Sequence, residues 1–232
     1  MQTPTLFADL RQPTSRPSFI GLNCLRDLNR PHIEWLAGQD GFAGEIHCDG
    51  RFFEWRREID LQPPAAYPDA GSLRFDGDIM VEEGREVPYV EHWHRAVRGA
   101  EPGAGFRLRE VSTGCRSIVV RRGDLFMYAR ARPGRSLAGG RLIDWVDRTS
   151  DLTLAQDLVD CEISYGRIES GGWLIERSSL PYRENQWLGL SACESGPGKI
   201  RTADVAPTGG FLCRSWEITN AQGTVGDVLQ GP

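Results

Sequence analysis

Two histidines, His92 and His94, stand two positions apart in the stretch 88–96, whose β-branched and aromatic residues predict a β-strand. Side chains alternate between the two faces of a strand, so both imidazoles share one face while Glu91 and Trp93 share the other. An imidazole exchanges protons near neutral pH and also binds metal ions. The spacing therefore predicts either an acid–base site or two ligands of a metal, provided that the histidine face looks into a cavity.

A hairpin signature precedes this strand, where Asp49-Gly50 separates two stretches of alternating polarity. Asp-Gly is typical of a two-residue turn with positive φ angles, and it predicts that Cys48 pairs with Arg51. In that register one face is an apolar core wall: Ile46, Cys48, Phe53, Trp55, Ile59 and Leu61. The other face is either solvated or lines a wet cavity: Glu45, His47, Phe52, Glu54, Arg56, Glu58 and Asp60.

Acid–base chemistry without a cofactor or a metal is the function that we expect first. A barrel interior excludes water, and a carboxylate beside a histidine tunes its pKa toward neutrality. Such a site suits lyase, dehydratase, isomerase or cyclase reactions, in which moving one proton is most of the task. The predicted catalytic residues are His92, His94, Glu54 and Asp76. The predicted substrate-binding residues are Arg56, Tyr89, Phe52, His47 and Asp78.

Two other classes of function stay open. A β-barrel also serves as a carrier for an apolar ligand or as a protein-interaction module, without any catalysis. The His-x-His pair would alternatively belong to a metal site, with His47, Glu45 or Glu54 as the third ligand. The six cysteines include no C-x-x-C pair, which argues against a zinc site of the usual spacing.

The composition limits the partners that we expect. A chain of 232 residues with 25% charged residues and a net charge of −5 is an ordinary globular protein, and the negative charge argues against general nucleic-acid binding. Lys199 is the only lysine among the 27 basic residues. Arginine suits carboxylate or phosphate recognition, but we attribute this bias to a GC-rich genome.

No apolar stretch reaches the ~18 residues of a membrane-spanning helix, and the N-terminal 17 residues lack the hydrophobic core of a signal peptide. We therefore expect a cytoplasmic protein that binds a small-molecule ligand or substrate. Nucleic acid and membranes are not expected partners, and a homodimer is compatible with the sequence.

Short strands at intervals of about ten residues, separated by glycine and proline, predict an antiparallel barrel or sandwich. One short helix is expected after Asp151, which has the position of an N-cap. A faint duplication accompanies the strands, because Glu45-Ile46 and Glu162-Ile163 each lead into a hairpin with a tryptophan on its return strand. The second copy has Arg214-Ser215-Trp216-Glu217 in place of 91–94, so the histidines are specific to the first copy.

Five short segments together form a recognisable series: Asp69-Ala70-Gly71, Val90-Glu91-His92-Trp93, Cys115-Arg116-Ser117-Ile118-Val119-Val120, Ile163-Ser164-Tyr165-Gly166 and Ser215-Trp216-Glu217-Ile218. This series resembles the fungal Hri-type proteins, which consist of two lipocalin-like β-barrels in one chain. The resemblance extends from about Phe42 to Thr219, although the chain departs from the family at the second histidine of its His-x-His strand. It implies paired ligand-enclosing barrels but no catalytic residues.

We therefore predict an all-β fold of two lipocalin-like antiparallel barrels in tandem. Residues 1–17 are predicted to be a flexible N-terminal arm. Residues 18–111 are predicted to form the first barrel, which holds the ligand site, and residues 112–232 the second barrel, which supports it.

Overall fold

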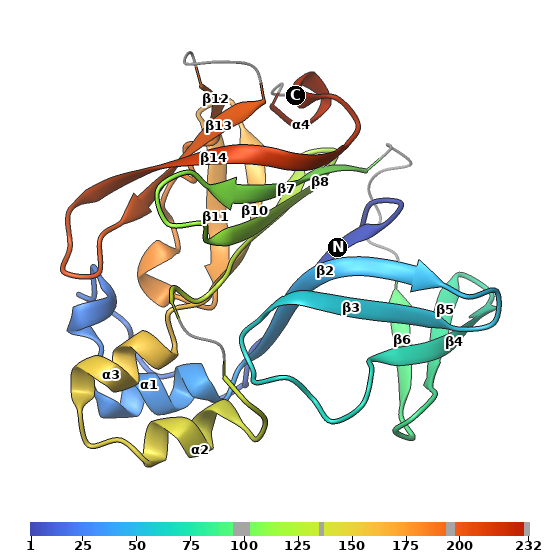
Figure 1. The fold of residues 1–232 in the computed structure, drawn as a ribbon, viewed down its shortest axis with the longest axis horizontal. Coiled ribbons are helices and arrows are strands. Elements are labelled where there is room, and N and C mark those ends of the chain that lie inside the picture. The colour runs from blue at the N-terminus through green and yellow to red at the C-terminus, as the bar shows by residue number, and fades with distance from the viewer. Residues whose placement is uncertain (95–102, 135–136, 194–197, 230–232) are drawn as a thin grey trace.

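The computed structural model describes residues 1–94, 103–134, 137–193 and 198–229, and its strands form two strongly curled antiparallel sheets (Figure 1). The first sheet follows the chain from one edge to the other as a six-stranded meander. Its strands are β1 (Leu6–Arg11), β2 (Asp40–Cys48), β3 (Phe53–Asp60), β4 (Ala70–Asp76), β5 (Ile79–Gly84) and β6 (Val90–His94). The strand predicted over 88–96 is thus β6, and residues 95 and 96 lie outside the described part.

The second sheet has eight described strands in the order β11-β10-β9-β8-β7-β14-β13-β12. The long β14 returns to pair with β7, so the end of the chain completes this sheet. Its strands are β7 (Ala104–Glu110), β8 (Arg116–Arg122), β9 (Leu125–Arg130), β10 (Glu162–Glu169), β11 (Gly172–Ser178), β12 (Ser191–Ala192), β13 (Lys199–Val205) and β14 (Phe211–Gln222). A mostly β fold with two curled sheets in tandem confirms the coarse prediction.

Three short helices gather at one end of the molecule (Figure 1). Asp151 accepts hydrogen bonds from the backbone N–H groups of Thr153 and Leu154, which confirms the predicted N-cap of α3. The helices are α1 (Arg30–Ala37), α2 (Leu142–Asp147), α3 (Leu152–Leu158) and α4 (Val225–Leu229), with 3-10 turns at Leu25–Asp27 and Pro181–Arg183. Within the described ranges, no helix has the length and apolar character that crossing a bilayer demands.

The two sheets share one hydrophobic core with these helices. Leu6 of β1, Ala43 of β2 and Ile59 of β3 pack into it from the first sheet, and Ile118 and Ile163 from the second. Each of these five residues is at most 1% exposed to solvent. Burial of this kind contributes about 25 cal/mol for each Å² of apolar surface, so the shared core holds the two sheets together.

The hairpin between β2 and β3 differs from the predicted two-residue turn. Cys48 pairs with Phe53, so the loop contains four residues. The Asp49 carboxylate accepts hydrogen bonds from the backbone N–H groups of Arg51 and Phe52, and this side-chain turn replaces the tighter one. The register moves by two residues, an even number, so the side chains next to the loop keep their predicted faces.

A β-bulge overturns the predicted face of two apolar residues. Gly44 pairs with Arg57 but Ala43 pairs with Ile59, so Glu58 is an extra residue in β3. Ile59, predicted to share a core wall with Trp55, lies instead in the core between the sheets, as does Leu61. A Cβ on Gly44 would lie 1.9 Å from the carbonyl oxygen of Arg56, so the bulge requires glycine here.

The strands also divide the chain differently from the predicted domains. Residues 6–11, predicted to belong to a flexible arm, form β1 and pair with β2 over Leu6–Arg11. The strand Ala104–Glu110, which falls in the range 18–111 predicted for the first barrel, is β7 of the second sheet. Because β1 contributes Leu6 and Ala8 to the shared core, the burial of its apolar residues accounts for its order.

A network of charged side chains fills part of the second half-barrel. Arg130 is 2% exposed, and its guanidinium donates a 2.6 Å hydrogen bond to Asp160. Arg183 binds the fully buried Glu162 at 3.2 Å. Burial alone would raise the pKa of Asp204, but the guanidinium groups of Arg130, Arg183 and Arg214 hold that pKa below its ordinary value. Asp204 therefore depends on these arginines to stay ionised.

Replacing Arg130 with methionine should lower the free energy of unfolding by about 3–5 kcal/mol, because Asp160 and Glu162 would then be buried with fewer cations. Urea denaturation at pH 7 measures this change. The same substitution at the exposed Arg51 is the control and should change stability by less than about 0.5 kcal/mol. Equal stability of the two variants would show that the network contributes little.

Candidate functional site

The concave face of the first sheet contains a pocket of about 190 Å³ that extends from β1 to β6. We call it the aromatic pocket. Phe7 and Phe42 meet edge to face, with 6.0 Å between ring centroids, and Trp55 packs against them. The indole of Trp93 lines the same space from β6. The polar and charged side chains that line it are Gln2, Asp9, Arg11, Arg57, Asp69, Glu82, Tyr89 and Glu91.

Glu82 is the most buried of the charged side chains in the aromatic pocket, with 3% exposure. The hydroxyl of Tyr89 donates a 2.5 Å hydrogen bond to one carboxyl oxygen, and the indole Nε1 of Trp93 donates a 2.9 Å bond to the other. Burial raises the pKa of Glu82, although these two bonds oppose the shift. Burial and the contact with Glu82 also raise the pKa of Tyr89. Glu82 is thus a carboxyl group whose proton is held more tightly than usual.

Two arginines order the other carboxylates of the pocket. Arg57 lies over the ring of Phe42, 3.5 Å from its centroid, and donates a 2.7 Å hydrogen bond to Asp69. Arg11 binds both oxygens of Glu91, at 2.8 and 3.1 Å. Because Arg11 lies on β1 and Glu91 on β6, this pair links the two edge strands of the first sheet. The curled sheet is therefore closed by side chains where it has no further strand.

The predicted histidines lie on the opposite side of β6. The alternation expected from the sequence is confirmed, since His92 and His94 are exposed while Glu91 and Trp93 are half-buried. The face that meets the aromatic pocket is the one with Glu91 and Trp93. The imidazoles stand beside Val81 and Ile79 of β5 in the strand register. The structure therefore does not bring them to the pocket or to Glu54.

Three of the predicted site residues meet at the end of the β2–β3 hairpin. His47, Phe52 and Glu54 line a hollow of about 110 Å³, and His47 pairs directly with Glu54 across the strands. Arg56 donates a 3.1 Å hydrogen bond to Glu54, and both side chains are exposed to solvent at least in part. This group is a small polar cluster on the surface of the hairpin.

The remaining predicted residues are Asp76, Asp78 and Tyr89. Asp76 and Asp78 flank Gly77, whose φ of 60° marks the β4–β5 turn, and both are exposed. Tyr89 alone among the nine predicted site residues lines the aromatic pocket. No group of three or more His, Cys, Asp or Glu side chains within the described residues is arranged to hold a metal ion.

The two histidines singled out from the sequence lie on β6, which lines this pocket, but on its outer face, and the sequence did not single out Glu82. Trp93, which the predicted alternation places on the face opposite the histidines, donates its indole N–H to the most buried carboxyl group of the site. The alternation along β6 places Glu91 on the same face as Trp93. Glu82 of β5 pairs with Glu91 across the strands, so all three side chains lie on the face that meets the pocket. Two glutamates that face each other on adjacent strands are the signal that was available.

Comparison of the chain with protein-family models, with curated proteins and with solved structures finds no match in any of the three. The fold and the pocket define a mostly β protein with two curled antiparallel sheets and an aromatic, carboxyl-containing pocket on the first. The resemblance to the Hri-type proteins, the cytoplasmic location and the homodimer stay predictions.

Replacing Glu82 with glutamine should remove a pH-dependent part of the stability. Because the pKa of Glu82 is raised, the folded protein holds its proton more tightly than the unfolded chain does. This contribution is fully present below the ordinary pKa of 4.5 and is lost as the pH rises through the raised value. The unfolding free energy of the wild type, minus that of Glu82→Gln, should therefore fall as the pH rises above 4.5.

Urea titrations at a series of pH values measure this difference. Glu83→Gln is the matched control, because the neighbouring Glu83 is exposed and faces away from the pocket. A difference curve for Glu82→Gln that is as flat as that of the control would contradict the raised pKa.

Proposed function

We propose that the protein binds a small, partly apolar organic molecule in the aromatic pocket. The observation that carries this proposal is the buried Glu82 carboxyl, held by Tyr89 and Trp93 beside a wall of aromatic rings. Binding sites for small molecules combine apolar walls with a few fixed polar groups in this way. At about 190 Å³ the pocket suits a molecule of one or two rings, or a short-chain compound, rather than a large lipid.

The contrast between the two sheets supports assigning the ligand to the first one. The interior of the second half-barrel contains the fully buried Trp216, Tyr128 and the charged network around Arg130. We infer that each curled sheet is a lipocalin-like unit, as the resemblance to the Hri-type proteins implies. In this proposal the first unit binds the ligand and the second stabilises the chain.

Proton transfer without a cofactor is the second candidate function, and the raised pKa of Glu82 favours it. A carboxyl group with a raised pKa is a better base when ionised and keeps its proton closer to neutral pH. The Tyr89 hydroxyl beside it has one O–H, which it donates to Glu82. On substrate binding that O–H would turn from Glu82 to an enolate oxygen and stabilise it, which leaves the Glu82 carboxyl oxygen free to take the proton. Glu82 then takes the role that the sequence suggested for a histidine, in a reaction of the lyase or isomerase type.

Binding is tested with a library of small organic fragments and ligand-observed NMR. Fragments that bind the wild type should lose most of their signal with Trp93→Leu, and should bind Tyr89→Phe about tenfold more weakly, because one hydrogen bond to the pocket carboxyl network is lost. His92→Ala is the matched control on the outer face of the same strand and should bind as the wild type does. Fragments whose binding is lost with His92→Ala and kept with Trp93→Leu would contradict the assignment of the site to the aromatic pocket.

Proton transfer is tested by incubating carbonyl-containing fragments in D₂O and following exchange at the carbon next to the carbonyl. The base removes one proton from that carbon and solvent returns a deuteron. Wild-type protein should accelerate the exchange, and Glu82→Gln should reduce it by about 100-fold or more while fragment binding persists. Exchange that is equally fast with Glu82→Gln would rule out Glu82 as the base.

A further inference from the structure

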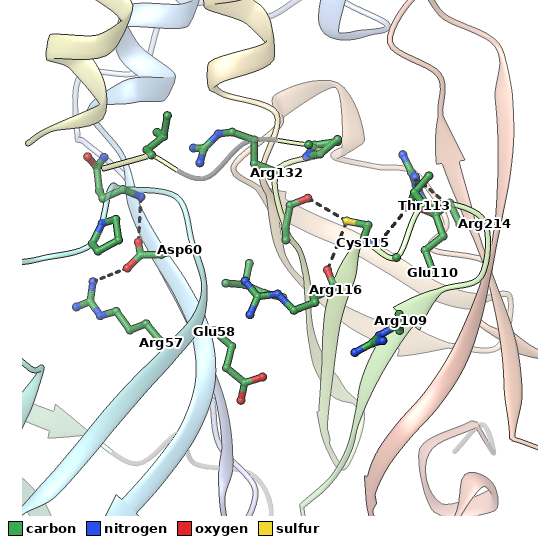
Figure 2. Close-up of a pocket in the computed structure, with 18 residues that line it drawn as sticks. Arg57, Glu58, Asp60, Arg109, Glu110, Thr113, Cys115, Arg116, Arg132 and Arg214 are labelled. Carbon is green, nitrogen blue, oxygen red and sulfur yellow. Dashed lines mark hydrogen bonds and ion pairs between the residues drawn. The ribbon is translucent and has the colours of Figure 1, made fainter. Parts of the chain in front are cut away.

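A second cavity, of about 510 Å³, lies between the two sheets (Figure 2). It differs from the aromatic pocket because most of its charged lining residues are arginines and none of its described lining residues is aromatic. One wall is β3 of the first sheet, and the other is formed by β7, β8 and the loop between them. We call it the arginine cleft, because five guanidinium groups but only three carboxyl groups line it. They are Arg57, Arg109, Arg116, Arg132 and Arg214, with Glu58, Asp60 and Glu110. This local excess of positive charge occurs in a chain of net charge −5.

Every carboxyl group of the arginine cleft already has a cation. Glu58 accepts a 2.9 Å hydrogen bond from Nε of Arg107, which reaches across from β7. Asp60 binds Arg57 at 3.3 Å. Glu110 binds Arg214 at 2.9 and 3.1 Å. These pairs leave the charges of the other arginines uncompensated.

Arg109 and Arg116 are the two arginines on which the inference depends. They face each other directly across β7 and β8, an arrangement of like charges that destabilises a sheet. Figure 2 shows both side chains reaching from that wall toward β3. Within the described residues neither one forms an ion pair or a side-chain hydrogen bond, although Glu217 of β14 is the cross-strand neighbour of Arg109 on its other side.

A third guanidinium completes the set. Arg132 donates its hydrogen bonds to two backbone carbonyls, those of Leu158 and Leu61, at 2.6 and 2.8 Å. These contacts hold the guanidinium in place but do not neutralise its charge. The floor of the cleft is partly apolar, with Ile59 and Leu137 among the lining residues. The cleft thus offers several cationic forks above a small apolar surface.

We propose that the arginine cleft binds a small organic anion that carries two or more phosphate or carboxylate groups. Guanidinium groups bind both kinds of group through paired N–H donors, so the shared chemistry is multivalent oxyanion recognition. A cavity of this volume holds a metabolite-sized molecule. The anion would supply the negative charge that the pairing of Arg109 with Arg116 lacks.

Isothermal titration calorimetry at low ionic strength tests the proposal with two probes, inorganic pyrophosphate and citrate. At least one should bind the wild type, and preference for pyrophosphate or for citrate would assign the natural ligand to phosphorylated or to carboxylated compounds. Arg109→Gln and Arg116→Gln should each weaken binding about tenfold, and added NaCl should weaken it further. Arg116→Lys keeps the charge without the fork and should lie between wild type and Arg116→Gln.

Arg51→Gln is the matched control, since it removes an equal charge from an exposed position outside the cleft, and it should bind as the wild type does. The melting temperature without ligand should not fall in Arg116→Gln, because the substitution relieves a repulsion between like charges. Binding of neither probe, or equal losses in Arg51→Gln and Arg116→Gln, would overturn the proposal. A lower melting temperature of ligand-free Arg116→Gln would instead assign the arginine to fold stability and overturn it as well.

Discussion

The bulge opposite Gly44 is the constraint on which both the aromatic pocket and the shared core depend. One extra residue in β3 places Arg57 on the concave face and Ile59 two positions later in the core between the sheets. Without that shift Ile59 would point into the aromatic pocket and the shared core would lose a fully buried side chain. The glycine is required because any side chain would collide with the backbone of Arg56. A single backbone irregularity therefore serves packing and the site together.

The two half-barrels deal with charge in opposite ways. The second sheet buries a network of arginines and carboxylates around Arg130, which occupies its interior and is costly to break. The ion pairs of the first sheet join partly exposed side chains, as in Arg11 with Glu91 across the open edge and Arg57 with Asp69 in the aromatic pocket. The same pocket contains aromatic rings and the buried Glu82. In the proposed function, the first sheet is therefore the binding unit and the second the stabilising one.

The sequence predicted a mostly β fold, the α3 cap and the alternation along β6, because these features are encoded locally in turn residues and in the period of two. It assigned β1 to a flexible arm, because the partner strand of β1 comes much later in the chain. It did not predict the bulge, because the close approach of Gly44 to the backbone of Arg56 depends on how β2 pairs with β3. The burial of Glu82 and the meeting of Arg109 with Arg116 also arise from pairing between strands. The arginine bias was attributed to genome composition, and only the register shows where those charges gather.

Native mass spectrometry of the protein as purified from cells tests the central claim most directly. We expect a bound small molecule on the wild type and on His92→Ala, and its loss from Trp93→Leu, because the aromatic pocket and not the outer face of β6 holds it. A bound molecule that is retained by Trp93→Leu and lost from His92→Ala would contradict the account.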